Sequence, residues 1–172
     1  MSTSEFQQMK DFIKNFVSDA DVDGGSVRIG VNVFSSKSYI EFNLNSYSTK
    51  AEIFTALDNI DYKKGSTNIA DALKKTRTKM FTVNNGDRPG VDNIIILMSD
   101  GKSTKNTKRT IPEAELARNE GIHIYTIAIG YQDLSELDAI SSKPVDENRF
   151  VIENFGKLKE LKKKVFAAFC GK

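Results

Sequence analysis

Residues 92–101 read DNIIILMSDG, an apolar run that ends in a polar Ser-Asp-Gly. Uninterrupted apolar residues from Ile94 to Met98 are typical of a central strand in a parallel sheet, because both faces of such a strand are covered. Residues 122–129 form a second run of the same kind. We therefore predict two buried strands, and we expect Asp100 at the edge of the sheet where the first of them ends.

Helical and strand patterns alternate along the rest of the chain. We expect strands at 26–34, 38–44, 92–98, 122–129 and 149–152, and helices at 4–18, 49–60, 68–81, 112–119, 134–141 and 155–169. This order predicts a single α/β domain over residues 1–172, with a doubly wound, mostly parallel central sheet and helices on both faces. A short turn at 35–37 implies a hairpin, which adds one antiparallel edge strand. Ser4 is the expected N-cap of the first helix.

Composition restricts the class of function. Apolar residues make up 39% of the chain and its formal net charge is +2, which indicates a soluble globular protein and argues against a nucleic-acid partner. No apolar stretch approaches the roughly 20 residues of a membrane span, so we expect no membrane insertion. The first residues lack a signal-peptide pattern, which is compatible with a cytosolic protein and equally with a piece of a secreted one.

Two polar loops could carry a ligand site at the carboxyl ends of the strands. The Asp100 carboxylate could bind a hard divalent cation, or it could cap the turn that follows. The Thr67 hydroxyl could bind a metal or an anion, or else Ser66 or Thr67 could be the N-cap of the helix at 68–81. Taken singly, each loop is explained as well by capping as by ligand binding.

Considered together, the motifs resemble the von Willebrand factor A family. The stretches that carry the resemblance are Lys64–Leu73, Ile95–Gly101, Gly121–Gly130, Phe6–Phe16 and Val27–Phe34. They span nearly the whole chain in the family's order of elements. The resemblance implies a metal-ion-dependent adhesion site that holds Mg²⁺ or Mn²⁺ with five side chains, to which a carboxylate of the ligand is added.

Two of those five side chains match this sequence, namely Thr67 and Asp100. The family takes the other three from an Asp-x-Ser-x-Ser stretch at the end of its first strand, which this sequence lacks. The residues from Met1 to Phe6 fit the segment that follows that stretch, so the domain is expected to be N-terminally truncated relative to the family. The site is accordingly expected to be incomplete in this chain.

Further residues are expected around the metal on the ligand-binding rim. These are Ser66, Asn68, Lys102 and Ser103. Lys102 would add a positive charge that favours acidic ligands. Cys170, the single cysteine, is either a free thiol or one half of an interchain or domain-closing disulfide. Because many extracellular members carry a cysteine after the last helix, the resemblance favours the disulfide and a secreted protein.

The function that the resemblance implies is adhesion without catalysis. The expected partner is an extracellular matrix protein such as collagen, and the expected location is the extracellular matrix. An intracellular scaffold in a multiprotein complex is the alternative, and a chelatase-like enzyme subunit is a third class. Gly101-Lys102-Ser103 is not a phosphate-binding loop, because Ile96 stands where that motif needs glycine. The single histidine, His123, has no arrangement of serine or cysteine around it that indicates a triad.

Overall fold

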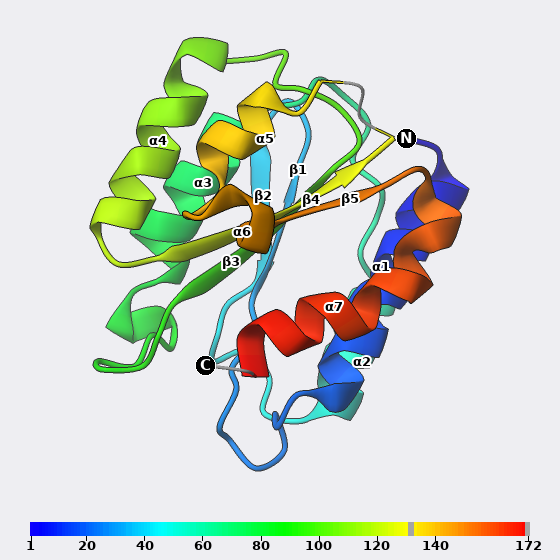
Figure 1. The fold of residues 1–172 in the computed structure, drawn as a ribbon. Coiled ribbons are helices and arrows are strands. Elements are labelled where there is room, and N and C mark those ends of the chain that lie inside the picture. Colours follow the sequence, from blue (N-terminus) through cyan, green and yellow to red (C-terminus); the bar gives the residue numbers. More distant parts are fainter. Residues whose placement is uncertain (131–132, 171–172) are drawn as a thin grey trace.

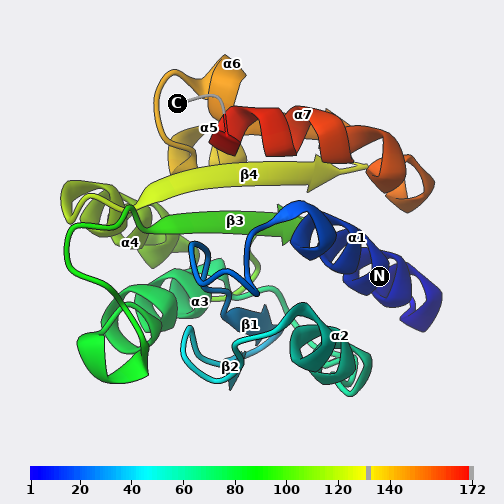
Figure 2. The same cartoon turned by 90° about the horizontal axis from the view of Figure 1, so that it is seen from below.

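The strands of the protein form two separate sheets (Figure 1). The structure is a computed structural model, and it describes residues 1–130 and 133–170. The strands are β1 (Val31–Phe34), β2 (Ser38–Phe42), β3 (Ile94–Ser99), β4 (His123–Ile129) and β5 (Arg149–Ile152). β3, β4 and β5 are parallel and adjacent in that order, whereas β1 and β2 form an antiparallel hairpin. Seen from below, the hairpin lies apart from β3 and β4 (Figure 2).

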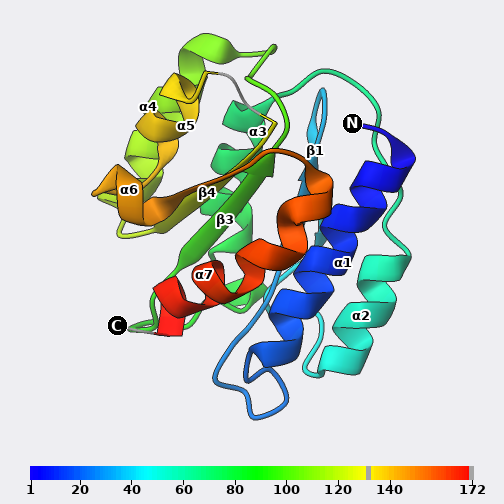
Figure 3. The ribbon, with the colours of Figure 1, turned by 45° about the vertical axis from the view of Figure 1, so that its right-hand side comes forward.

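Helices cover both faces of the parallel sheet, as the sequence predicts for a doubly wound α/β fold. They are α1 (Thr3–Asp19), α2 (Lys50–Asp58), α3 (Ile69–Lys75), α4 (Thr107–Asn119), α5 (Ser135–Ile140), α6 (Val145–Asn148) and α7 (Leu158–Cys170). A π-helical turn follows α3 at Thr76–Met80, and short 3₁₀ turns lie at Val83–Asn85 and Phe155–Lys157. Figure 1 shows α3, α4 and α5 on one side of the sheet, and Figure 3 shows α1 and α7 together on the other.

The apolar run of β3 supplies the core on both sides. Ile95 and Leu97 pack into the cluster that α3, α4 and α5 share, whereas Ile96 and Met98 pack with α1 and α7. Successive side chains of a strand point to opposite faces, so a strand covered on both faces needs apolar residues at every position. Fully covering one such side chain contributes about 1.5–3 kcal/mol. The predicted coverage of both faces is thereby confirmed, although among the described residues β3 lies at the edge of the three-stranded sheet and β4 lies at its centre.

A third cluster attaches the hairpin to the helices. Phe42 of β2 packs with Phe6 of α1 and with Ile53 and Leu57 of α2, and both α2 residues are fully buried. In β1, by contrast, all four residues are only half-buried. β1 is therefore covered less completely than β3.

Several predicted boundaries were wrong. Ser2, and not Ser4, caps α1, because its side chain accepts from the N–H of Glu5 while the Glu5 carboxylate accepts from the N–H of Ser2. α4 begins at Thr107, so Pro112 lies inside the helix. The α-helix after residue 68 ends at Lys75 and continues as the π turn. The first predicted strand pairs only over β1, where the register with β2 shifts between Val31 and Asn32.

None of the described helices is long and apolar enough to cross a membrane. Cys170 closes α7, and its side chain lies outside the part of the chain that the structure describes.

Candidate functional site

The carboxyl ends of β1 and β3 meet at one loop, residues 64–68. The carbonyl oxygen of Ser35, directly after β1, accepts from the N–H of Asn68 at 3.0 Å. In the loop after β3, the N–H groups of Thr104 and Lys105 both donate to the carbonyl oxygen of Thr67, at 2.8 and 3.1 Å. The structure therefore brings together the two polar loops that the sequence singled out, at the edge of the sheets where ligands of α/β folds bind.

Hydrogen bonds hold the backbone around Thr67 from two sides. Its N–H donates to the hydroxyl oxygen of Thr104 at 2.9 Å, and the N–H of Ser66 donates to the hydroxyl oxygen of Ser36 at 3.0 Å. Gly65 has a φ of +151°, and a Cβ there would stand 2.6 Å from the Ser36 hydroxyl oxygen. Glycine is thus required for the loop to approach the β1–β2 turn this closely.

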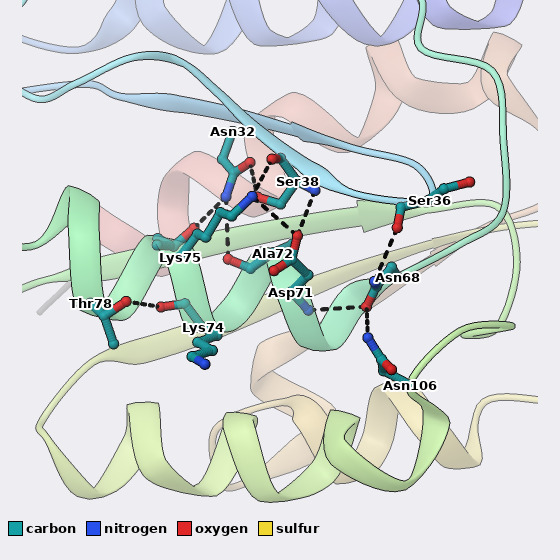
Figure 4. Close-up of polar contacts among 11 residues, drawn as sticks. Asn32, Ser36, Ser38, Asn68, Asp71, Ala72, Lys74, Lys75, Thr78 and Asn106 are labelled. Atoms are coloured by element: carbon teal, nitrogen blue, oxygen red, sulfur yellow. Dashed lines mark hydrogen bonds and ion pairs between the residues drawn. The ribbon is translucent and has the colours of Figure 1, made fainter.

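Asn68 is the N-cap of α3, the role that the sequence left open between Ser66 and Thr67. Its side-chain oxygen accepts from the N–H of Asp71 at 3.1 Å, and its amide group donates to the carbonyl oxygen of Ser36 at 3.2 Å (Figure 4). Only 3% of Asn68 is exposed. Its side chain therefore supports the Thr67 loop from within, although we expected it at the ligand-binding rim.

Behind this cap, a polar network joins α3 to the hairpin, and sequence reasoning missed it. The Asp71 carboxylate accepts from the N–H of Ser38 at 2.8 Å and pairs with Lys75 at 3.3 Å, while Lys75 donates to the Ser38 carbonyl oxygen (Figure 4). Asn32 of β1 donates to the carbonyl oxygen of Ala72. The i,i+4 spacing of Asp71 and Lys75 was the one available signal in the sequence.

Asp100 lies at the end of β3 with its side chain 29% exposed. One carboxylate oxygen lies 3.0 Å from the amino group of Met1, a cationic nitrogen. Before it, the Ser99 hydroxyl donates to the carbonyl oxygen of Gly101 and so shapes the turn away from the strand. Asp100 is therefore partly exposed at the rim, directly after the carboxyl end of β3.

The loop after Asp100 is tied to the segment that begins α5. Lys102 pairs with Asp133, and the N–H of Ser103 donates to the Glu136 carboxylate at 2.8 Å. Ser103 is 9% exposed and its hydroxyl accepts from Thr110 at 3.1 Å, so it too supports the rim from within. The hydrogen bond from Lys102, followed by the N–H of Ser135, holds the pKa of the Asp133 carboxyl well below its usual value.

The oxygen donors at this rim fit Mg²⁺ or Mn²⁺ in kind. The Asp100 carboxylate and the Thr67 hydroxyl are hard oxygen ligands of the type that these cations prefer. Across residues 1–130 and 133–170, no group of three or more His, Cys, Asp or Glu side chains is placed to hold a metal ion. The oxygen ligands at this rim are therefore of the kind that Mg²⁺ and Mn²⁺ prefer, but they are few.

Comparison with known proteins decides the family. A family model, the von Willebrand factor type A domain, matches residues 1–164. The chain belongs to the von Willebrand factor type A family. Its relatives include the mouse collagen alpha-4(VI) and alpha-6(VI) chains, at 30% and 34% identity over 96% of this chain, and chicken matrilin-3 at 28% over 96%. This chain spans 7% of each collagen chain and 37% of matrilin-3.

Solved structures of the family share the fold. Proximal thread matrix protein 1 from the mussel byssus superposes with a TM-score of 0.91, at 30% identity, over 98% of this chain and 44% of that one. A second structure of that protein, at 29% identity and a TM-score of 0.90, is described as having a zinc-occupied MIDAS motif. A metal is thus bound at the adhesion motif of a relative.

Proposed function

We propose that this von Willebrand factor type A domain is a non-enzymatic adhesion module of the extracellular matrix. In this proposal it binds an acidic side chain of collagen or another matrix protein through Mg²⁺ or Mn²⁺ held at Thr67 and Asp100. The observation that supports the proposal most is that the Thr67 loop and the loop after Asp100 meet at the carboxyl ends of β1 and β3, where the N–H of Thr104 donates to the Thr67 carbonyl oxygen at 2.8 Å.

The residues around the cation would have different roles. Asp100 would supply a charged oxygen and Thr67 a neutral one, and the reciprocal bonds between Thr67 and Thr104 keep the two loops together. When bound, the cation would supply positive charge for a carboxylate of the ligand.

Lys102 and Ser66 would contact the ligand beside the metal. Lys102 is exposed and its ammonium group would attract an acidic ligand once it leaves Asp133. Ser66 is exposed in the Thr67 loop. Asn68 and Ser103 would act indirectly, because both are buried and hold the loops in place.

The identity of the relatives supports a location in the extracellular matrix. Collagen VI chains and matrilins are among the proteins that match, and the superposed structure is that of a matrix protein. A disulfide at Cys170 in the native protein would accompany the extracellular location.

The experiment measures attachment of the domain to immobilised collagen in Mg²⁺, in Mn²⁺ and in a chelator. We expect binding in either metal that the chelator removes and that Asp100→Asn abolishes, whereas the matched variant Asp146→Asn, on exposed α6, binds like the wild type. Binding that is equal in the chelator, or that Asp100→Asn leaves intact, would contradict the proposal.

A further inference from the structure

Three loops at the rim of the domain each carry an exposed lysine. Lys37 lies in the turn between β1 and β2, Lys64 lies in the loop ahead of α3, and Lys105 lies in the loop after β3. None of the three ammonium groups has an ion-pair partner among the described residues. Their charges are therefore open to solvent and to an anionic partner.

The side chain of Asn68 brings two of these lysines to one place. Its amide group donates to the carbonyl oxygen of Ser36 at 3.2 Å, and its side-chain oxygen accepts from the amide nitrogen of Asn106 at 3.5 Å (Figure 4). Lys37 directly follows Ser36 in the chain, and Lys105 directly precedes Asn106. The two lysines therefore lie on either side of the same buried cap.

The loop that carries Lys64 lies against the turn that carries Lys37. The N–H of Ser66 donates to the Ser36 hydroxyl oxygen at 3.0 Å. At Gly65, a Cβ would stand only 2.6 Å from that same oxygen. The backbones of all three lysine-bearing loops are thus held together by hydrogen bonds.

The acidic side chains near these lysines offset little of their charge. Asp133 pairs with Lys102, and the Glu136 carboxylate accepts from the N–H of Ser103 at 2.8 Å. Asp100 contributes one negative charge at the same edge of the sheets. The rim therefore has an excess of positive charge, although the formal net charge of the whole chain is only +2.

Lysine at these positions indicates the kind of anion that the rim would bind. A lysine ammonium group is a point charge, whereas the planar fork of arginine suits two-point recognition of a carboxylate or a phosphate. A fourth exposed lysine, Lys108, lies in the first turn of α4, and the adjacent Arg109 pairs with Glu113 at 3.1 Å. Point charges on separate loops fit a partner that repeats anionic groups along its length.

We propose that the rim binds a sulfated polysaccharide through four lysines, namely Lys37, Lys64, Lys105 and Lys108. The choice of a polysaccharide rests on the proposed function, because sulfated polysaccharides are polyanions of the extracellular matrix. Sulfate groups stay ionised at every physiological pH, so the contacts are electrostatic and need no metal ion. The polysaccharide chain lies beside the proposed metal site at Thr67 and Asp100.

The Asp100 carboxylate separates this inference from metal-dependent adhesion. Because a carboxylate repels sulfate groups, Asp100→Asn should bind the polysaccharide in a chelator at least as tightly as the wild type does. The same variant is expected to lose its metal-dependent attachment to collagen. Failure of polysaccharide binding is therefore distinct from failure of adhesion.

The experiment measures the Kd of the domain for a heparin octasaccharide in a chelator, over a range of salt concentrations. The test variant replaces three rim lysines, by Lys37→Gln, Lys64→Gln and Lys105→Gln. The matched control replaces three exposed lysines of α7, by Lys159→Gln, Lys163→Gln and Lys164→Gln. The two variants have the same net charge, so a difference between them reports the position of the lysines.

We expect the rim variant to bind at least about tenfold more weakly at moderate salt, and the slope of log Kd against log salt concentration to fall by about two, as for lost phosphate contacts in a polyanion. The α7 variant should bind like the wild type. An octasaccharide from which the sulfate groups have been removed should not bind.

Three results would overturn the proposal. Equal weakening in the rim and α7 variants would mean that net charge alone explains the binding. Equal binding of the octasaccharide without sulfate groups would mean that the lysines do not hold it. Tighter binding of a polyglutamate peptide with the same number of charges would mean that the surface fits an acidic protein.

Discussion

Thr67 and Thr104 hold each other by a reciprocal pair of hydrogen bonds. The N–H of Thr67 donates to the Thr104 hydroxyl oxygen at 2.9 Å, and the N–H of Thr104 donates to the Thr67 carbonyl oxygen at 2.8 Å. Thr67 and Asp100 lie in different loops, so this pair fixes one proposed metal ligand relative to the loop that contains the other.

Replacement of Thr104 tests that link. Thr104→Val keeps the shape of the side chain and removes the hydroxyl acceptor, so we expect the free energy of unfolding to fall by about 0.5–1.5 kcal/mol. Thr104→Ser retains the hydroxyl and should cost much less. Urea denaturation of both variants measures the difference, and equal stabilities of the valine and serine variants would show that the hydroxyl does not hold the loop.

The N-cap of α3 should contribute more to the free energy of unfolding than the Thr104 hydroxyl does, because Asn68 is buried. Asn68→Ala removes the acceptor for the N–H of Asp71 as well as the donor to the Ser36 carbonyl oxygen. We expect a loss of about 1–2 kcal/mol. Asn68→Ser keeps a capping oxygen and should lose less than the alanine variant. Thermal denaturation gives both values, and a serine variant as unstable as the alanine variant would argue against the capping role.

Much of the fold could be predicted from the sequence, because the spacing of apolar residues indicates which faces of a helix or strand are buried. The runs at 94–98 and 122–129 identified β3 and β4 and placed Asp100 at the rim. The N-cap residues were harder to predict, because Ser, Thr and Asn are all good caps and neighbouring positions compete. Asn68 is the cap in the structure, because its amide group also donates to the Ser36 carbonyl oxygen. Ser36 lies 32 residues away in the sequence, so a local sequence pattern does not indicate this contact.

The division into two sheets could be expected only through the resemblance. Local patterns identify strands, whereas pairing depends on what lies beside each edge. β1 is a short half-buried strand although its sequence, from Val27 to Val33, alternates as a longer strand would. Among the described residues β1 pairs only with β2, so no strand lies beside its other edge to extend it.

Glu113 is the least exposed side chain in any ion pair of the chain's described part. Its carboxylate is 4% exposed and contacts Arg77 at 3.0 Å and Arg109 at 3.1 Å. Glu113→Ala would leave the Arg77 guanidinium largely buried without this partner, so we expect a loss of about 3–5 kcal/mol. Glu120→Ala, which removes the second and half-exposed partner of Arg77, should cost about 0–1 kcal/mol. Chemical denaturation measures the loss of stability in each variant, and similar losses in Glu113→Ala and Glu120→Ala would contradict this explanation.

Asp133 should titrate below its usual range. Its pKa is lowered first by the hydrogen bond from Lys102 and then by the N–H of Ser135. The unfolded chain takes up its proton at higher pH than the folded one, so the pair favours folding above the ordinary pKa of aspartate and this contribution is lost as the pH falls through the folded pKa. Carboxyl-carbon NMR measures the titration.

Lys102→Met should raise the pKa of Asp133 toward the ordinary value and leave a smaller depression from Ser135. Lys105→Met, which removes another exposed lysine of the same loop, is the matched control and should leave it unchanged. An ordinary pKa for Asp133 in the wild-type domain would mean that the pair does not persist in solution.

Location of a bound Mn²⁺ tests the central claim most directly. Mn²⁺ broadens the NMR signals of nearby amides, so titration of the isotope-labelled domain shows where the ion binds. We predict that residues 65–68 and 99–102 broaden first, with weak affinity in the range of about 10⁻⁴–10⁻³ M for a site with few protein ligands. Asp100→Asn should abolish the effect. Broadening that begins elsewhere, or that Asp100→Asn leaves unchanged, would contradict the assignment of Thr67 and Asp100 to a cation site.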